Sequence, residues 1–403
     1  MYRKLAGTAR RVVGGHARWV VRCGRGILAE QAELPVGVKR LWRAVQRIGE
    51  ERVAEHQAAE RAYDALPLPA QQQSPVQLVP QVACVQMDGG RLQLRDRHEE
   101  PAERAEPASY WKEMKAGALV SMQSQVQAED PCPELPVTFV DPGKMREIAR
   151  EIKGFTTDAK PGAAAEAPAE EEAEERGSER PGKPQPLVRS VVALVGDVDE
   201  FGLRLASAAH ARGFHAAVRK AFVADGAEAN WGVHRRYFSQ YTPIVDFVHA
   251  LMYVYAAAMA GRAAGEGWSA YRQWAQWLWS GQVEQVIAAL TERQQPLGLP
   301  ADQESGTPRA QVAETLRYLT NQRARMKYDE YRRQGLPLTS NYIESTIKQI
   351  NRRMKGTEKF WSVAANAMLS LVADQLSQTH VISPFWLRRT IRIAAQACYH
   401  QVI

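Results

Sequence analysis

The sequence contains few cysteines, and none of them forms a pair at metal-binding spacing. Four cysteines are scattered over 403 residues, with no C-x-x-C pair and no histidine at ligand spacing beside them: Cys23, Cys84, Cys132 and Cys398. Neither a zinc knuckle nor a disulfide framework is supported by this distribution. The cysteine usage fits a reducing cytosol.

Long hydrophobic runs without charge are also absent. The most apolar stretch, PIVDFVHALMYVYAAAMAG, contains Asp246 and His249. It therefore predicts a buried strand and helix rather than a membrane span. The basic N-terminus lacks an apolar segment followed by a small-residue cleavage site, which argues against an export signal. We expect a cytoplasmic protein with no membrane partner.

Positive charge is in excess and is unevenly distributed. The formal net charge is +7, and the first fifty residues hold eleven Lys or Arg against three acids. The stretch EAPAEEEAEERGSER is strongly acidic, so the rest of the chain is more basic than the total shows. Because clustered Lys and Arg neutralise phosphates, the charge favours nucleic acid as a partner.

The residue patterns divide the chain into helical, strand-like and low-complexity segments. Residues 1 to about 66 place apolar side chains at helical spacing among arginines. From Gln81 the pattern becomes strand-like, in VACVQM, RLQLR and GALVSMQSQVQ. A stretch from about 156 to 186, rich in Ala, Glu, Pro and Gly, cannot bury a core and is predicted to be disordered.

Order is predicted to resume after this stretch. RSVVALVG and YTPIVDFVHA are strand candidates, and DVDEFGLRLASAAHARGF is typical of a helix whose acidic start, at Asp197 and Asp199, serves as its cap. From YTPIVDFVHA to about Gly335 the chain is predicted to be mostly helical.

Three carboxylates stand out as a set, although each has a simpler interpretation alone. Asp88 lies in MDGG, which fits a hairpin turn because Asp-Gly and Gly-Gly supply positive φ angles. Asp225 ends an apolar run before a helix, where a turn or cap residue is common. Glu344 follows Asn341 by three residues, the spacing of a capping box. Together, two strand-end Asp and a helix-borne Glu can converge on two divalent ions, for which hard oxygen ligands favour Mg²⁺ or Mn²⁺.

These motifs resemble the DDE-type transposases of bacterial insertion sequences, in the Mutator-like group. VQMDGGRLQLR is similar to the segment of their first catalytic Asp, FVADGAEANW to their second Asp-Gly motif, and LPLTSNYIESTIKQINRRMKGTEKFW to their catalytic Glu helix. Asp246 and His249 match an acid-x-x-His element common in this group, and we take them as support for the site. The four motifs occur in order and cover most of residues 81–375.

The resemblance implies an α/β fold with an RNase H-like core of the retroviral-integrase type, in which a mixed sheet has flanking helices. Asp88 would then lie within one bent first strand, and not in a hairpin turn. The expected organisation follows the chain: a basic, DNA-binding helical region at 1–75, core segments at 76–130 and 188–255, a helix and acidic disordered linker between them at 131–187, an all-helical insertion at 256–334, the catalytic Glu helix and a core-closing helix at 335–375, and a basic C-terminal tail at 376–403.

The resemblance also implies a metal-dependent enzyme that cuts and joins DNA at the bacterial nucleoid. Asp88, Asp225 and Glu344 would hold two Mg²⁺ or Mn²⁺ ions for hydrolysis at the element ends, followed by attack of the freed 3′ hydroxyl on target DNA. The partners would be double-stranded DNA, as terminal inverted repeats and target, and at least a second copy of the chain in a homodimer. Cations that follow Glu344 would bind DNA phosphates: Lys348, Arg352, Arg353, Lys355 and Lys359.

Two other hypotheses stay open at the level of sequence. The first is a catalytically silent DNA-binding protein derived from a transposase, which would bind DNA without cutting it. The second is an unrelated helical scaffold in which the three acids are caps and turns and lie far apart in space. A stripe of cations on a helix is also common on solvated surfaces.

Overall fold

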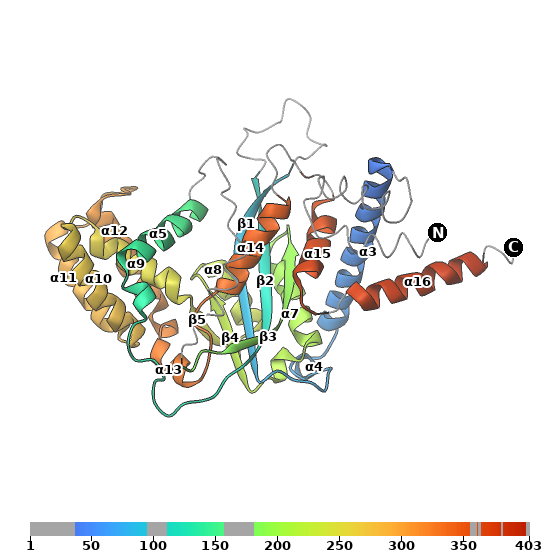
Figure 1. The fold of residues 1–403 in the computed structure, drawn as a ribbon, viewed down its shortest axis with the longest axis horizontal. Helices are drawn as coiled ribbons and strands as arrows, with labels where there is room; N and C mark the ends of the chain where they lie inside the picture. Colours follow the sequence, from blue (N-terminus) through green and yellow to red (C-terminus); the bar gives the residue numbers. More distant parts are fainter. Residues whose placement is uncertain are drawn as a thin grey trace.

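The computed structural model describes residues 37–94, 111–156, 181–354, 361, 364–379 and 382–399. These residues form an α/β fold around a five-stranded mixed sheet (Figure 1). The strand order is β3-β2-β1-β4-β5, which makes β1 the central strand. The α/β class predicted from the sequence is confirmed.

The sheet has an antiparallel half and a parallel half. β1 (Val82–Gln93), β2 (Trp111–Gln123) and β3 (Gln185–Leu194) are antiparallel neighbours, whereas β4 (Arg219–Ala224) pairs parallel with β1, and β5 (Thr242–Val245) pairs parallel with β4. The first six residues of β1 are buried, as expected for a central strand with helices on both faces.

Opposite faces of the sheet are covered by different helices. Gly117 pairs with Met87, and a Cβ at Gly117 would lie 2.7 Å from Leu205 of α7 (Val198–Ala211). A Cβ at Gly90 would point to the other face, and it would lie 3.5 Å from Ile347 of α14 (Asn341–Met354). Successive residues of a strand alternate between faces, so α14 covers the face that carries Asp88, and α7 covers the reverse.

Asp88 lies in the middle of β1, and the hairpin interpretation of MDGG is wrong. β2 pairs with β1 over its whole length, and Asp88 stands opposite Ala116. Neither Gly89 nor Gly90 has a positive φ, because the partner strand holds the backbone extended through this point.

Helix α3 (Val38–Asp64) packs against helices of the main core. It is therefore not a separate unit, although the sequence predicted a boundary after residue 75. α3 packs along α15 (Ala365–Leu376) and α7, and it buries a stripe that includes Leu41, Val45 and Ile48. A Cβ at Gly49 would lie 2.5 Å from the carbonyl oxygen of Ala367, so only glycine permits this approach of α3 to α15. α4 (Leu68–Gln71) follows α3.

Two elements of the structure cross boundaries that were expected from the sequence. β3 begins at Gln185, before the expected boundary at 187, and α9 (Phe247–Met259) crosses the one at 255. Most of the expected basic tail forms α16 (Ile382–Tyr399), which extends from the body of the molecule in Figure 1. It is anchored by buried Phe385 and Trp386 and by ion pairs from its arginines to Glu51 and Glu55 of α3. Residues 157–180 of the expected linker lie outside the described residues.

The expected helical insertion forms a group of helices beside the parallel half of the sheet (Figure 1). The group consists of α9, α10 (Ala264–Trp279), α11 (Val283–Leu297), α12 (Pro308–Gln322) and α13 (Tyr328–Arg333). Elsewhere α5 (Pro142–Thr156) precedes β3, and α8 (Glu228–Tyr237) joins β4 to β5. No helix in the described part of the chain is both long and apolar enough to cross a membrane.

Candidate functional site

The parallel register brings three acids to the same level of adjacent strands. β1 and β4 pair Gln86 with Val223, so Asp88 and Asp225 each follow two residues later. β4 and β5 pair Ala224 with Val245, and Asp246 comes next. The backbone N–H of Asp246 also donates to the carbonyl of Ala224 at 2.8 Å. One level across β1, β4 and β5 therefore carries Asp88, Asp225 and Asp246.

The buried side chain of Gln86 places the start of α14 over this level. Its Oε1 accepts a hydrogen bond from the N–H of Ile343 at 3.1 Å, and its Nε2 donates to the carbonyl of Thr339 at 2.9 Å. Gln86 and Asp88 are two residues apart on a strand and share a face. Glu344, next to Ile343, is thereby brought to the face of the sheet that carries Asp88.

Asp246 connects the start of α14 to the start of α9. It is fully buried, and its Oδ2 accepts hydrogen bonds from the hydroxyl of Ser340, at 2.6 Å, and from the Ser340 N–H. Its Oδ1 accepts from the N–H of His249 at 2.9 Å, as the N-cap of α9. His249 Nδ1 lies 3.6 Å from Asp246 Oδ1 and 3.9 Å from Glu344 Oε1.

Asp246, His249 and Glu344 form a cluster that can hold a metal ion. One potential ligand atom from each lies within 4.8 Å of the others, and among the described residues this is the only such group of three or more. His249 Nδ1 is a buried nitrogen with no hydrogen-bond partner in the described part of the chain. Two carboxylates and a free imidazole nitrogen fit a divalent cation. Asp88 and Asp225 are not members of this compact group.

The acids influence one another electrostatically. Burial, followed by the charge of Asp225, raises the pKa of Asp88 to about 6. Burial, followed by the charge of Asp246, raises the pKa of Glu344 to about 7, and Asp88 contributes in the same direction. Burial alone would lower the pKa of His249, but Asp246, Glu344 and Asp225 outweigh it and raise that pKa to about 9. The site therefore favours positive charge, whether an imidazolium or a cation.

The simpler roles of the acids are present alongside this arrangement. Asp225 Oδ1 accepts from the N–H of Ala227 at 2.9 Å and from Asn230 Nδ2 at 2.8 Å, which is a turn role at the start of α8. Glu344 does not form the expected capping box with Asn341, because Asn341 is the first residue of α14 and not its N-cap. Its Oε1 lies instead 3.2 Å from the hydroxyl of Ser340.

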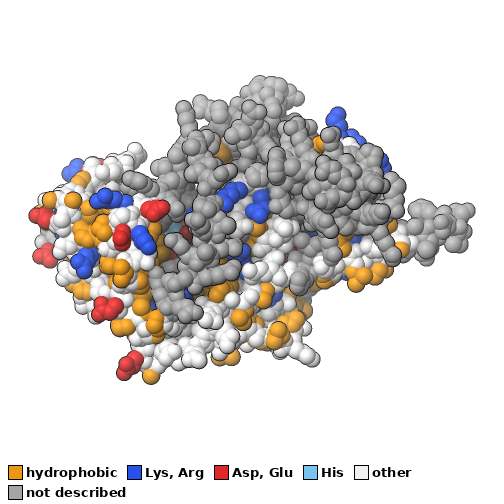
Figure 2. Space-filling model, viewed as in Figure 1, with side chains coloured by type: hydrophobic (Ala, Val, Ile, Leu, Met, Phe, Trp, Pro, Cys, Tyr) orange, Lys and Arg blue, Asp and Glu red, His pale blue; other side chains and the backbone are white. Residues whose placement is uncertain are grey.

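The cations that follow Glu344 are only partly described. Arg352 is exposed, Lys348 is half-buried, and Arg353 is half-buried with a hydrogen bond to the carbonyl of Gln349. Lys355 and Lys359 lie outside the described residues. Figure 2 shows Lys and Arg side chains gathered on this face near the end of α14.

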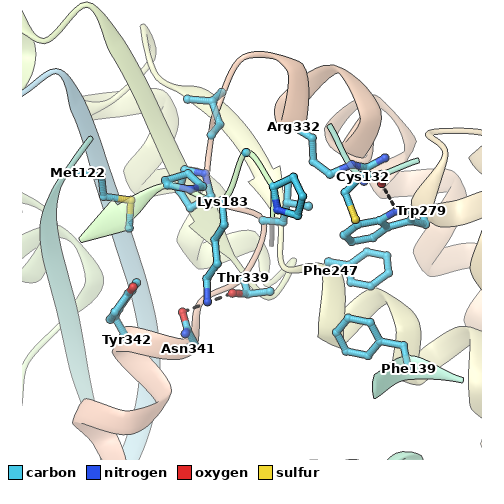
Figure 3. Close-up of a pocket in the computed structure, with 16 residues that line it drawn as sticks. Met122, Cys132, Phe139, Lys183, Phe247, Trp279, Arg332, Thr339, Asn341 and Tyr342 are labelled. Carbon is cyan, nitrogen blue, oxygen red and sulfur yellow. Dashed lines mark hydrogen bonds between the residues drawn. The ribbon is translucent and has the colours of Figure 1, made fainter. Parts of the chain in front are cut away.

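A mostly apolar pocket lies beside the start of α14 (Figure 3). Its lining includes Phe247, next to Asp246, and Thr339 and Asn341, which flank Ser340. On the far side, Trp279 donates its Nε1–H to the carbonyl of Cys132 at 2.8 Å. None of the candidate acids lines this pocket, so it adjoins the carboxylate cluster without containing it.

Sequence reasoning missed the uncharged residues that hold the acids in place: Gln86, Asn230 and Ser340. A signal existed for Gln86, because a polar residue inside the buried run VACVQM requires a partner. Ser340 directly precedes a helix, a position typical of a capping residue. The partners of these side chains lie far away along the chain and could not be identified from the sequence.

The fold and the site define an α/β protein with a mixed five-stranded sheet and a carboxylate–histidine cluster at its parallel half. No protein-family model matches this chain, and a search of curated proteins finds no match. The geometry of the site is therefore the basis for a functional assignment.

Proposed function

We propose that this protein is a DDE-type DNA transposase with an RNase H-like core, which cuts DNA at element ends and joins them to target DNA. The observation that carries the proposal is the common level of Asp88 and Asp225 on adjacent parallel strands, beneath the helix that bears Glu344. Carboxylates that converge from separate elements are what two-metal phosphodiester chemistry requires.

The sheet order supports the RNase H-like part of the proposal. Three antiparallel strands are followed along the chain by two parallel ones, and the first strand is central. Asp88 lies on that first strand, as the resemblance implies, and Asp225 directly follows its parallel neighbour. The common level of Asp88 and Asp225 argues against a scaffold in which these acids are distant caps.

Each residue of the site has a distinct role in this proposal. Asp88, Asp225 and Glu344 would hold two Mg²⁺ or Mn²⁺ ions, for which carboxylate oxygens are suitable ligands. Such ions, when bound, activate the attacking oxygen and stabilise the leaving one. Asp246 keeps Ser340, and with it the first turn of α14, in place. His249 lies beside Glu344 and balances part of the negative charge.

Double-stranded DNA is the proposed partner. Lys348 and Arg352 follow Glu344 by four and eight residues, so they share its side of α14, and they would contact the phosphates next to the reacting one. The excess of cations in the chain favours the same polyanion. Because two element ends must be joined, we propose at least a homodimer in the DNA complex.

The test is cutting of DNA duplexes taken from the regions that border the coding sequence, with Mg²⁺ or Mn²⁺ present. The parent protein is expected to release a 3′ hydroxyl at a defined position and to join it to a second duplex. Asp88→Asn, Asp225→Asn and Glu344→Gln should each lower the cutting rate at least about 100-fold, since each removes the negative charge of a proposed metal ligand.

Two outcomes would contradict this assignment. Variants that cut as fast as the parent would remove the three acids from the mechanism. A parent protein that binds these duplexes with either metal but never cuts them would instead favour the catalytically silent DNA-binding protein.

A further inference from the structure

Helix α12 of the helical group is attached to the turn that carries Asp225. The hydroxyl of Tyr318 donates a hydrogen bond to the backbone carbonyl of Asp225 at 2.7 Å. One helical turn later, Gln322 Nε2 donates to the carbonyl of Gly226 at 2.9 Å. Two successive carbonyls of the turn are thus bound by two side chains from one face of α12.

The turn has a backbone conformation that requires glycine and lies directly against Tyr318. Gly226 has a φ of +105°, and a Cβ built there would lie 2.9 Å from the ring of Tyr318. Glycine is the residue that adopts such a conformation without strain. The ring of Tyr318 therefore covers the turn on one side, while the carboxylate of Asp225 is held by Ala227 and Asn230.

Tyr318 is itself held by α9, the helix whose N-cap is Asp246. Its ring stacks on Tyr253 of α9, with centroids 4.0 Å apart and planes 16° from parallel. One turn earlier on α12, the hydroxyl of Thr315 donates to the carbonyl of Tyr253 at 3.1 Å. Helix α12 therefore contacts both the Asp225 turn and α9, the helix that contains His249 and has Asp246 as its N-cap.

We propose that Tyr318 and Gln322 are positioning residues, which fix the Asp225–Gly226 turn so that the Asp225 carboxylate is oriented for metal binding before the metal arrives. This inference rests on the proposed function. A carboxylate whose backbone is already fixed loses less conformational freedom on binding, so the affinity for the ion is higher. The helical group thereby acts on the chemistry through α12 without touching the substrate.

A purely structural role would produce a different result from a positioning role. Losing a buried hydroxyl contact lowers stability wherever it occurs in the fold. Losing a positioning contact also raises the metal concentration needed for half-maximal cutting, and saturating metal restores the rate. Mn²⁺ affinity, measured without DNA, is therefore the discriminating property.

The experiment compares Tyr318→Phe, alone and with Gln322→Leu, against the parent and the matched control Tyr271→Phe. The Tyr271 hydroxyl makes the same kind of buried bond, to the carbonyl of Phe139 at 2.8 Å, outside the acid-bearing segments. Mn²⁺ binding is measured by electron paramagnetic resonance titration, and thermal unfolding is recorded for each variant. The dissociation constant for Mn²⁺ should rise about tenfold in the double variant, the effect of about 1.4 kcal/mol, and should stay at the parent value in Tyr271→Phe.

Asp225→Asn separates this inference from the proposed function. If Asp225→Asn weakens Mn²⁺ binding and cutting, whereas the Tyr318 and Gln322 variants bind Mn²⁺ as the parent does, the positioning role is wrong and the proposed function stands. If Asp225→Asn changes neither property, the proposed function itself is wrong. Tyr318→Phe keeps the stacked ring, so it tests the role even if the double variant does not fold.

Discussion

The side-chain oxygen of Gln86 accepts a hydrogen bond from the backbone N–H of Ile343, a residue 257 positions later in the chain. Gln86 is fully buried in the central strand, and its amide also donates to the carbonyl of Thr339. One side chain thus supplies the hydrogen bonds that water would otherwise make to two backbone groups at the start of α14. This contact, together with that of Asp246 to Ser340, holds Glu344 over the sheet.

Gln86→Leu should therefore destabilise the fold and displace Glu344. Leucine cannot bond either backbone group, and each unpaired buried group costs about 1–3 kcal/mol. Urea denaturation followed by circular dichroism should show a lower midpoint for Gln86→Leu than for Gln123→Leu, the same substitution at an exposed strand position. Equal midpoints for the two variants would show that α14 is held by other contacts.

Glu344→Gln and the double change Lys348→Ala with Arg352→Ala should have opposite effects. Glu344→Gln removes the charge of a proposed metal ligand, so cutting should be lost while DNA affinity stays near that of the parent. The double change should weaken DNA binding and reduce its salt dependence, because each lost phosphate contact releases about one fewer counterion. Binding measured at several salt concentrations, together with cutting assays, checks both effects. If Glu344→Gln cuts as well as the parent, Glu344 has only a structural role.

Gly49→Ala should destabilise the packing of α3 on α15. The new Cβ would lie 2.5 Å from the carbonyl oxygen of Ala367, and overpacking of this kind costs about 1–3 kcal/mol. Gly232→Ala in α8 is the matched control, since nothing lies within 4 Å of a Cβ built there. The control should be neutral or more stable by about 0.5–1 kcal/mol, because alanine favours helix. A Gly49→Ala protein as stable as the control would mean that α3 and α15 separate readily.

His56 should make the protein less stable as the pH falls below neutrality. Burial, followed by the charges of Arg52 and Arg204, lowers the pKa of His56 to about 3 in the folded protein, whereas an unfolded histidine has a pKa of about 6.5. Between these values the unfolded chain binds a proton that the folded protein does not, so stability falls with decreasing pH by at most about 1.4 kcal/mol for each pH unit. Between pH 7 and pH 5, unfolding measurements should show that acidification favours unfolding less in His56→Gln than in the parent.

His215 provides an internal comparison for this pH dependence. Burial, followed by the charge of His210, lowers its pKa to about 4, so it has a dependence of the same sign. Asp88 and Glu344, whose pKa values are raised to about 6 and about 7, contribute with the opposite sign. His56→Gln should therefore remove only the share of the slope that His56 contributes. An unchanged slope in that variant would show that His56 is protonated equally in the folded and unfolded states.

Local patterns predicted several elements correctly, because the forces that form them act over a few residues. The capped helix expected at DVDEFGLRLASAAHARGF is confirmed as α7, where Asp197 accepts a hydrogen bond from the N–H of Glu200 at 2.7 Å. The strand-like runs VACVQM and RSVVALVG lie in β1 and β3. A cap is made within one turn, and alternation of apolar residues follows from the geometry of a strand.

The same local reasoning failed for the hairpin at Asp88 because pairing between strands overrode the turn signal. Asp-Gly-Gly permits a turn, but β2 supplies hydrogen bonds on both sides of it, from Val82 opposite Met122 to Gln93 opposite Trp111. At 376–403 the sequence pattern predicted a basic tail and no element. Its arginines and buried aromatic residues form α16, which depends on acids of α3 more than 300 residues earlier.

The sequence by itself determined which residues are candidates for chemistry: the acids and the histidine of four short motifs. Only the tertiary structure decided how they lie, because their neighbours come from other elements. Strand register put Asp88 and Asp225 at one level, and Asp246 reaches Ser340 across 94 positions of chain. Register and packing are collective properties of the whole sheet and its helices, so no short stretch of sequence encodes them.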